Sequence, residues 1–232
     1  MQNGEFSELW KLSTVKPLIK KPGMELQYGN YRPISNLSFL SKVIEKLVLQ
    51  QYNHHIITHS LLPDYQSAYR QGYSCETALV KLFNDSLWSM EKKRVTTLCA
   101  IDLSAAFDTV DHDVLLTLLK NRFGISGNVF SWFRAYLRPR QFRVRVGETY
   151  SEPRAVDYSV PQGSVVGPQL FSAYASTLGD VVLSEHNISL YGFADDHVLS
   201  TEINLNDPLS ERRSISSLEQ CLNCVKEWTV TD

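Results

Sequence analysis

Two apolar segments that lead into aspartates constrain the fold of this chain most. Residues 95–101 form a β-branched and apolar run that ends at Asp102. Residues 188–203 form two strand-like runs interrupted by Ala194-Asp195-Asp196-His197, which contains an acid pair. Runs of this kind are typical of strands in a core, and turn-favouring acids between two of them predict a hairpin. We therefore expect one carboxylate at the carboxyl end of a strand and two more at a hairpin tip.

The remaining segments mix helical and strand-like patterns, which predicts an α+β fold. In the helix that begins after Ser74, the apolar period predicts an inner face formed by Ala78, Leu79, Leu82, Phe83 and Leu87. The predicted helices cover roughly 39–60, Ser74 to 94, Asp111 to Gly124, Ser126 to Pro139, the residues after Gly167-Pro168, and Asp207-Pro208 to the end; the predicted strands cover 95–101, 141–147, 155–160 and 188–203.

Length and composition indicate a globular protein of the cell interior. The 232 residues are 43% hydrophobic, which suffices for a core, and the chain has no run of 18 uncharged apolar residues and no signal-peptide pattern. Four dispersed cysteines suit a reducing compartment. We expect a location in the cytoplasm, the nucleus or both, without secretion or membrane association. Cys221 and Cys224 have zinc-like spacing but lack a second pair, which favours ordinary helix cysteines.

The net charge of −2 hides a gradient along the chain. Residues 1–98 hold 12 lysines and arginines against 8 acids, whereas residues 99–232 hold 11 against 17. A basic half beside an acidic half suits a protein that meets nucleic acid on one side and metal on the other.

The three aspartates suggest metal-assisted phosphoryl transfer. Two-metal chemistry needs two or three carboxylates that converge on ions about 3.5–4 Å apart. Because adjacent acids repel each other, the pair Asp195-Asp196 calls for a counter-cation. A plain solvated turn is the competing interpretation. His197 follows the pair, and we interpret it as a hairpin residue rather than a ligand.

Five ordered motifs give these acids a family context. The motifs are YRPISN at 31–36, QSAYR at 66–70, AIDLSAAFDTVDH at 100–112, VPQGSVVGP at 160–168 and YGFADD at 191–196. Together they resemble the reverse transcriptases of non-LTR, LINE-like retrotransposons, with jockey-like elements as the best match, and the resemblance covers roughly residues 10–230.

The resemblance implies a fold and a division of the chain. A reverse-transcriptase-like fingers and palm portion is expected, with an antiparallel palm sheet packed on helices and the thumb absent. An N-terminal extension would cover residues 1–30, the fingers 31–94, and the palm 95–232, truncated before the thumb. Together these parts would form one reverse transcriptase domain.

The resemblance also implies an RNA-directed DNA polymerase, a nucleotidyltransferase that joins a dNTP to a primer 3′-hydroxyl. Asp102 and Asp195 would coordinate two Mg²⁺ ions, with Mn²⁺ as the alternative metal, and Asp196 would complete the catalytic and metal-binding set. An RNA template, a DNA primer and dNTPs would be the partners. The sequence does not indicate a protein partner.

Further site residues follow from the same motifs. Phe107 matches an aromatic gate against ribonucleotides, although it could instead staple the following helix into the core. Gln162 and Gly163 would lie near the templating base, with a structural turn as the alternative. The expected dNTP-binding residues are Arg70, Phe107, Gln162, Gly163 and Leu103. The expected nucleic-acid-binding residues are Arg32, Phe193, Arg138 and Arg140, the last two from the basic stretch 134–145, whose arginines could equally be solvated.

Two other functions compete with an active polymerase. The chain could be an inactive, truncated relic of a retroelement, as departures such as Ser159 and the segment 175–177 from the usual motifs suggest. It could also be a domesticated nucleic-acid-binding module without turnover. Binding of a primer–template without metal-dependent extension would identify that module.

Overall fold

The chain forms two compact units, each built from two separate segments. The computed structural model describes residues 4–103, 107–183 and 188–231, so residues 104–106 of the IDLSAAFD motif lie outside the described part. Unit 1 comprises Met1–Leu61 and Phe107–Phe171, and unit 2 comprises Leu62–Ala106 and Ser172–Asp232. The two units alternate along the chain, whereas the predicted division cuts the chain into consecutive parts after residues 30 and 94. The two divisions differ because a compact unit is defined by contacts, which join segments far apart in sequence.

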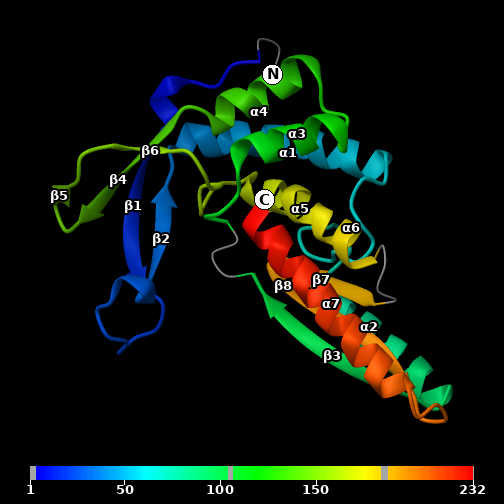
Figure 1. Ribbon diagram of the computed structural model, residues 1–232. Helices are drawn as coiled ribbons and strands as arrows, with labels where there is room; N and C mark the ends of the chain where they lie inside the picture. The colour runs from blue at the N-terminus through cyan, green and yellow to red at the C-terminus, as the bar shows by residue number, and fades with distance from the viewer. Residues whose placement is uncertain (1–3, 104–106, 184–187, 232) are drawn as a thin grey trace. The chain divides into compact units, whose positions relative to one another are not determined.

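Unit 1 contains a five-stranded sheet in which the N-terminal residues take part. β1 (Leu12–Ile19) runs antiparallel to β2 (Tyr31–Asn36) and parallel to β4 (Arg140–Val146), and β5 (Thr149–Tyr150) and β6 (Arg154–Val156) also pair with β4 (Figure 1). The sequence did not predict β1 or β2. Pro17 of β1 pairs with Pro33 of β2, and proline within a run argues against a strand. Residues 12–19 are therefore part of a sheet rather than an extension.

Aromatic side chains fill the helical core of unit 1. α1 (Phe39–Thr58), α3 (His112–Asn121) and α4 (Gly127–Leu137) match three predicted helices. The Asp111 carboxylate accepts hydrogen bonds from two amides at the start of α3, as its predicted capping role requires. Ser126 occupies the N-cap position of α4 without a side-chain hydrogen bond. The ring of Phe6 meets those of Trp132 and Tyr136 edge to face, so the N-terminal segment belongs to this core.

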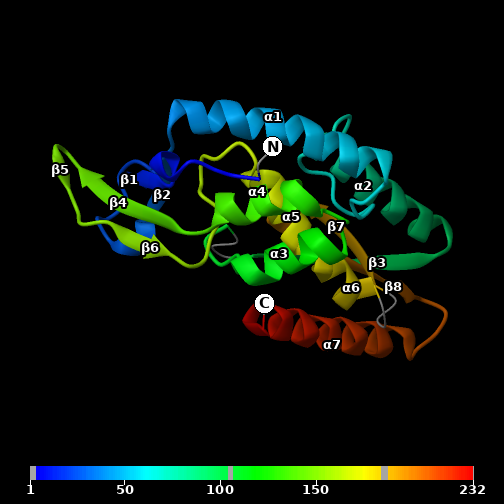
Figure 2. The ribbon, with the colours of Figure 1, turned by 90° about the horizontal axis from the view of Figure 1, so that it is seen from above.

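Unit 2 is a three-stranded antiparallel sheet between helices. Its order is β3 (Arg94–Asp102), β8 (Asp196–Asn204), β7 (Ser189–Phe193). α2 (Cys75–Glu91) packs on one face, and α7 (Ser210–Thr231) covers the other together with α6 (Leu178–Leu183) (Figure 2). Cys221 of α7 is buried in this core and Cys224 is partly buried on the same helix. The core contains Tyr65, Leu178, Val182, Ile188, Leu190, Leu199, Cys221 and Val225.

The predicted inner face of α2 is only partly correct. Ala78 and Leu82 are partly buried, whereas Leu79, Phe83 and Leu87 are exposed. Among the described side chains of α2 only Ser89 is fully buried. Polar groups make the contact with the sheet: Ser89 donates to Glu202 at 2.6 Å, and the Tyr191 hydroxyl donates to Asp85 at 2.9 Å. Hydrogen-bonding partners on the sheet thus decided which face of α2 turns inward.

No helix in the described ranges combines the length and the apolar character needed to cross a bilayer.

β3 is also less buried than its composition predicts. It lies at the edge of the sheet, and Val95 and Leu98 are exposed, whereas Ile101 packs partly against the core. Val95 and Leu98 are three positions apart and lie on opposite faces of the strand, so both faces of β3 are partly open. Its predicted end at Asp102 is confirmed.

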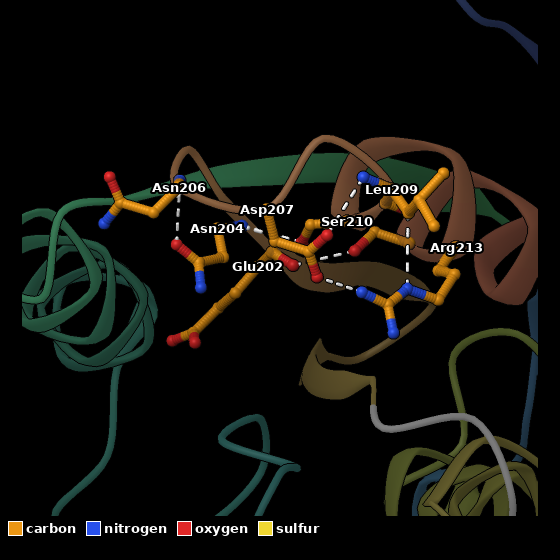
Figure 3. Close-up of polar contacts among 8 residues, drawn as sticks. Glu202, Asn204, Asn206, Asp207, Leu209, Ser210 and Arg213 are labelled. Atoms are coloured by element: carbon orange, nitrogen blue, oxygen red, sulfur yellow. Dashed lines mark hydrogen bonds and ion pairs between the residues drawn. The ribbon is translucent and has the colours of Figure 1, made fainter.

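A turn of local hydrogen bonds starts α7, the final helix (Figure 3). The Asp207 carboxylate accepts from the amide of Leu209 at 3.0 Å and also pairs with Arg213, while the Ser210 hydroxyl accepts from the amide of Asn204 at 2.8 Å. The Asp207 bond satisfies the amide of Leu209, which immediately precedes α7, and the Ser210 hydroxyl ties the end of β8 to the start of the helix. Asp207 thus organises the turn that leads into α7, three residues before the helix begins. The remaining elements are α5 (Gly167–Tyr174), whose start was predicted, and three short 3₁₀ turns, Glu8–Trp10, Tyr28–Asn30 and Ala175–Thr177.

Candidate functional site

The register of unit 2 brings the three aspartates to one end of the sheet. Asp102, the last residue of β3, is directly opposite Asp196, the first residue of β8, and Phe193 at the end of β7 is opposite Asp196 on the other side. Directly opposed residues have Cβ atoms about 4.5–5.5 Å apart and point to the same face. Asp195 precedes Asp196 in the turn between β7 and β8. Two segments more than 90 residues apart thus place three carboxyl groups together.

The three carboxylates lack a compensating group within the described part of the chain. Asp102 and Asp196 are exposed and Asp195 is partly buried, and none of the three has a hydrogen bond or ion pair with the residues that the structure describes. In the same ranges, no three histidine, cysteine, aspartate or glutamate side chains lie close enough together to hold a metal ion as they stand. The site is therefore a set of neighbouring, uncompensated acids rather than a preformed cage.

The turn between β7 and β8 is shorter than predicted and is conformationally strained. It contains only Ala194 and Asp195, because Asp196 and His197 already belong to β8. Ala194 has φ +59°, in the left-handed region that costs a non-glycine residue roughly 1–2 kcal/mol. A two-residue hairpin turn requires a positive φ at its first position, which explains this conformation.

His197 belongs to the strand and faces away from the acids. It is opposite Gly192 and Ile101, and its ring is buried. Burial lowers the pKa of the imidazole, while the hydrogen bond to the Asp195 carbonyl, 3.1 Å from Nδ1, acts in the opposite direction. A neutral ring that donates from Nδ1 to this carbonyl is consistent with the contact. The interpretation of His197 as a residue of the hairpin is supported by this placement.

Arg70 of unit 2 has an uncompensated donor. Its guanidinium carbon lies 4.5 Å from the centre of the Tyr73 ring, and one terminal nitrogen is 3.9 Å from the Asp64 carboxylate. The other terminal nitrogen is buried and has no hydrogen-bond partner among the residues with a described placement. Buried donors are rarely left unpaired, and a guanidinium fork suits phosphate oxygens. Leu103, which follows Asp102, is buried.

Gln162 and Gly163 form a tightly packed turn in unit 1. The Gln162 side-chain amide donates to both oxygens of Asp108 at 3.0 Å. The backbone carbonyl of Gln162 accepts from the backbone amide of Ser35 at 2.9 Å. Gly163 has φ +107°, and a Cβ on it would lie 2.8 Å from the Ser35 carbonyl oxygen. Burial raises the pKa of Asp108, whereas the bond from Gln162 lowers it. These contacts are those of a structural turn, and the predicted contact with the templating base stays a prediction.

Glu45 is a site-supporting residue that the sequence reasoning missed. Its side chain is completely buried on α1 and accepts from the Ser41 hydroxyl at 2.6 Å and from the amide of Val165 at 2.7 Å, with a longer contact of 3.4 Å to the amide of Val166. These amides immediately precede α5, so Glu45 anchors the loop that contains Gln162. The available signal was a glutamate within the apolar stripe of a predicted helix.

The remaining predicted residues differ in accessibility. The Phe107 ring is partly buried and packs against Phe171 of α5 with centroids 4.7 Å apart. This partner is not on α3, the following helix, so the gate and the staple both stay predictions. Arg32 is exposed on β2, and Phe193 is partly exposed on β7. Arg138 is also partly exposed and forms an ion pair with Asp113 at 2.7 Å.

Arg140 is buried, which corrects one of the predicted nucleic-acid contacts. Its side chain is almost completely buried, donates to the Tyr136 carbonyl at 3.0 Å, and lies over the rings of Phe6 and Tyr136. A guanidinium so enclosed cannot track a phosphate backbone, because its donors face the protein interior. Alternation along β4 buries this arginine, and we remove it from the expected nucleic-acid contacts.

Comparisons with known proteins give one consistent assignment. A family model described as "Reverse transcriptase (RNA-dependent DNA polymerase)" matches residues 19–231. The chain is 37% identical over 174 residues to a probable RNA-directed DNA polymerase from transposon BS of Drosophila melanogaster, covering 75% of this chain and 19% of that protein. It is 28% identical to the RNA-directed DNA polymerase from mobile element jockey of Drosophila funebris, over 92% of this chain and 23% of that protein.

Solved structures support the fold. An apo telomerase from Candida tropicalis, truncated from its C-terminal domain, superimposes with a TM-score of 0.59 at 13% identity, covering 92% of this chain and 47% of that one. At this identity the likeness concerns the fold alone, and it confirms the predicted α+β fold class. The chain spans about a fifth of the length of the curated relatives named above.

Proposed function

Because this chain belongs to the reverse transcriptase family of non-LTR retrotransposons, we propose that it forms the core of an RNA-directed DNA polymerase, which joins a dNTP to the 3′-hydroxyl of a primer. The observation that carries the proposal is the register of unit 2. It sets Asp102 directly opposite Asp196 and places Asp195 in the adjoining turn, and no cation in ranges 4–103, 107–183 and 188–231 is paired with them.

Two Mg²⁺ ions are the cations that we propose for these acids, with Mn²⁺ as the alternative. Carboxylate oxygens are the donors that such hard cations prefer, and the three acids have no competing partner among the described residues. Asp102 and Asp195 would hold both ions and Asp196 would complete the set. When bound, such ions make a hydroxyl more acidic and offset charge on a triphosphate. Side-chain adjustment is required, because the acids do not form a cage as they lie.

The protein's own groups would then select and position the nucleotide. Arg70 has a buried donor free for a phosphate oxygen, and Leu103 supports the neighbouring Asp102 from the protein interior. In unit 1, Phe107 would oppose a ribonucleotide 2′-hydroxyl, and Gln162 and Gly163 would form the floor beneath the templating base. We propose Arg32, Phe193 and Arg138 as contacts for template and primer.

Primer extension tests the proposal directly. The purified chain, with a DNA primer annealed to an RNA template, dNTPs and Mg²⁺, is expected to lengthen the primer, and the matched variant Asp195→Asn is expected to lose this activity. Binding of the same primer–template, measured by fluorescence anisotropy, gives a second readout. Binding without extension under any metal would replace the polymerase with a nucleic-acid-binding module, and the absence of both would indicate an inactive relic.

A further inference from the structure

The turn that presents Asp195 adopts a conformation that its own sequence does not favour. Ala194 has positive φ although it carries a Cβ, and it is 8% exposed. Glycine would adopt this φ without strain. A neighbouring group must therefore hold the turn, since an alanine left to itself would relax toward negative φ and move the Asp195 carboxylate.

The side chain of Gln66 provides that hold. Its amide nitrogen donates to the Ala194 carbonyl at 3.2 Å, and its oxygen accepts from the Ala194 amide at 3.1 Å. Both backbone groups of one residue are thus bound by one side chain. Only an amide side chain has a donor and an acceptor placed side by side for this purpose. Gln66 is 1% exposed, so water does not compete for these bonds.

Gln66 is itself fixed on both sides. Its oxygen also accepts from the Ala68 amide at 3.0 Å. The backbone of its neighbours pairs with Gly192 of β7: the Gly192 amide donates to the Tyr65 carbonyl at 2.8 Å, and the Ser67 amide donates to the Gly192 carbonyl at 2.9 Å. The segment around Gln66 therefore runs beside β7 as a short parallel partner.

Gly192 makes this close approach feasible. A Cβ on Gly192 would lie 3.1 Å from the His197 ring and 3.3 Å from the Gln66 amide nitrogen. Such distances are tighter than ordinary packing, so a larger residue would push Gln66 away from the turn. Farther along, the Tyr65 hydroxyl donates to the Ala175 carbonyl at 3.1 Å and accepts from the Gly179 amide at 3.2 Å. A chain of contacts thus ties the turn to the helical layer of unit 2.

We infer that Gln66 is a positioning residue of the acid site, which holds the Ala194–Asp195 turn in its strained conformation through the backbone of Ala194. It has no contact with the three carboxylates, so it acts only through the geometry of the turn. This inference rests on the proposed function insofar as Asp195 binds a metal. Whether Gln66 stabilises the conformation of the turn can be measured without any catalysis.

The test compares Gln66→Met with the control Gln71→Met, an exposed glutamine in the same segment. Methionine matches the length of glutamine but cannot bind Ala194. We expect faster hydrogen exchange of the Ala194 amide and a Kd for Mn²⁺, followed by electron paramagnetic resonance, that rises by about 10–100-fold, the range seen when residues supporting metal ligands are removed. Gln71→Met should change neither.

A second substitution distinguishes a lost positioning of the turn from general damage to the fold. Adding Ala194→Gly to Gln66→Met should restore much of the Mn²⁺ affinity, because glycine adopts the required φ unaided. If Gln66→Met does not fold, Gln66→Asn takes its place, since it stays neutral and keeps the amide but is one methylene too short to bind both backbone groups of Ala194. Unchanged Ala194 exchange in the folded variant would overturn the inference. If the unaltered chain neither binds Mn²⁺ nor extends primers, the polymerase proposal fails, whereas the exchange experiment still decides the role of Gln66.

Discussion

The two compact units hold their central loops with buried side chains of opposite character. In unit 2 the neutral amide of Gln66 binds the turn that contains Asp195, and in unit 1 the carboxylate of Glu45 binds the amides that precede α5. A carboxylate suits a helix N-terminus, where unpaired amides concentrate positive charge. The same group beside the acid hairpin would add repulsion. The charge of the neighbouring site thus explains which polar side chain can serve as the anchor.

The difference extends to the whole units. Unit 1 contains 15 lysines and arginines against 10 acids, a net charge of +5, whereas unit 2 contains 8 against 15, a net charge of −7. The separation is larger than the +4 and −6 of the two sequence regions, because the chain segments interleave. A basic unit paired with an acidic one agrees with the proposed division between nucleic-acid binding and metal binding.

Removing a charge from the acid hairpin should have the largest effect. We expect Asp102→Asn and Asp195→Asn each to lower primer extension by about 10³-fold or more, as the loss of a metal ligand implies, and Asp196→Asn to lower it less. The free energy of unfolding should stay equal or rise, because repulsion between the acids falls. Single-turnover extension and urea unfolding measure the two effects, with Glu219→Gln as an exposed control. Equal losses for all three aspartates would contradict the auxiliary role of Asp196.

The second-largest expected effect is a lower free energy of unfolding when the buried carboxylate of Glu45, the anchor of unit 1, is removed. Glu45→Ala leaves the Ser41 hydroxyl and the Val165 amide without their buried acceptor. Each such donor costs about 1–3 kcal/mol, so we expect a loss of about 2–6 kcal/mol. Glu45→Gln keeps one acceptor and should cost less. Urea unfolding gives the values, and Lys46→Ala, exposed on the same helix, is the control. A loss below about 1 kcal/mol for Glu45→Ala would show that the loop does not depend on this anchor.

A pair of glycines separates strain from close packing in unit 1. Gly163→Ala combines a positive φ with a Cβ that would be 2.8 Å from a backbone oxygen, whereas Gly23→Ala has positive φ in open space. Gly23→Ala should therefore cost roughly 1 kcal/mol, and Gly163→Ala should cost about 1–3 kcal/mol more. Thermal unfolding compares the two variants. Equal losses would mean that the Gly163 turn has room to move away from Ser35.

The smallest effect concerns the pH dependence of unit 1. Burial lowers the pKa of His112, with Arg138 and Arg140 adding to the effect, while the bond from Nε2 to the Ser159 carbonyl, 2.8 Å, and Asp111 oppose it. A histidine with a lowered pKa is protonated more readily in the unfolded chain. Its contribution to stability is therefore complete above a pH of about 6.5 and is lost as the pH falls through the folded pKa.

The variant His112→Gln tests this linkage. It can still donate to Ser159 but does not titrate, so its free energy of unfolding should vary less between pH 7 and pH 5 than that of the unaltered chain. Urea unfolding at several pH values measures the slope. His54→Gln, at a surface position, serves as the comparison variant. An unchanged slope in His112→Gln would assign the pH dependence to other groups.

Local signals in the sequence predicted most elements of the fold. A 3.6-residue apolar period located α1 within two residues of its observed end, and Ser74 and Asp111 cap the helices that they were expected to cap. These signals succeed because capping bonds and helical periodicity involve residues close in sequence. Prolines in both partners concealed β1 and β2, since their pairing depends on a fold-level contact.

By itself, the sequence determined the family, the α+β class and the three acids of the candidate site, because motif order and local pattern are properties of the chain. Only the tertiary structure decided that Asp102 is opposite Asp196, that Arg140 is buried, and which face of α2 turns inward. It also revealed the anchors Gln66 and Glu45, whose partners lie 128 and 120 residues away. Such contacts depend on how distant segments pack, and no local pattern encodes that packing.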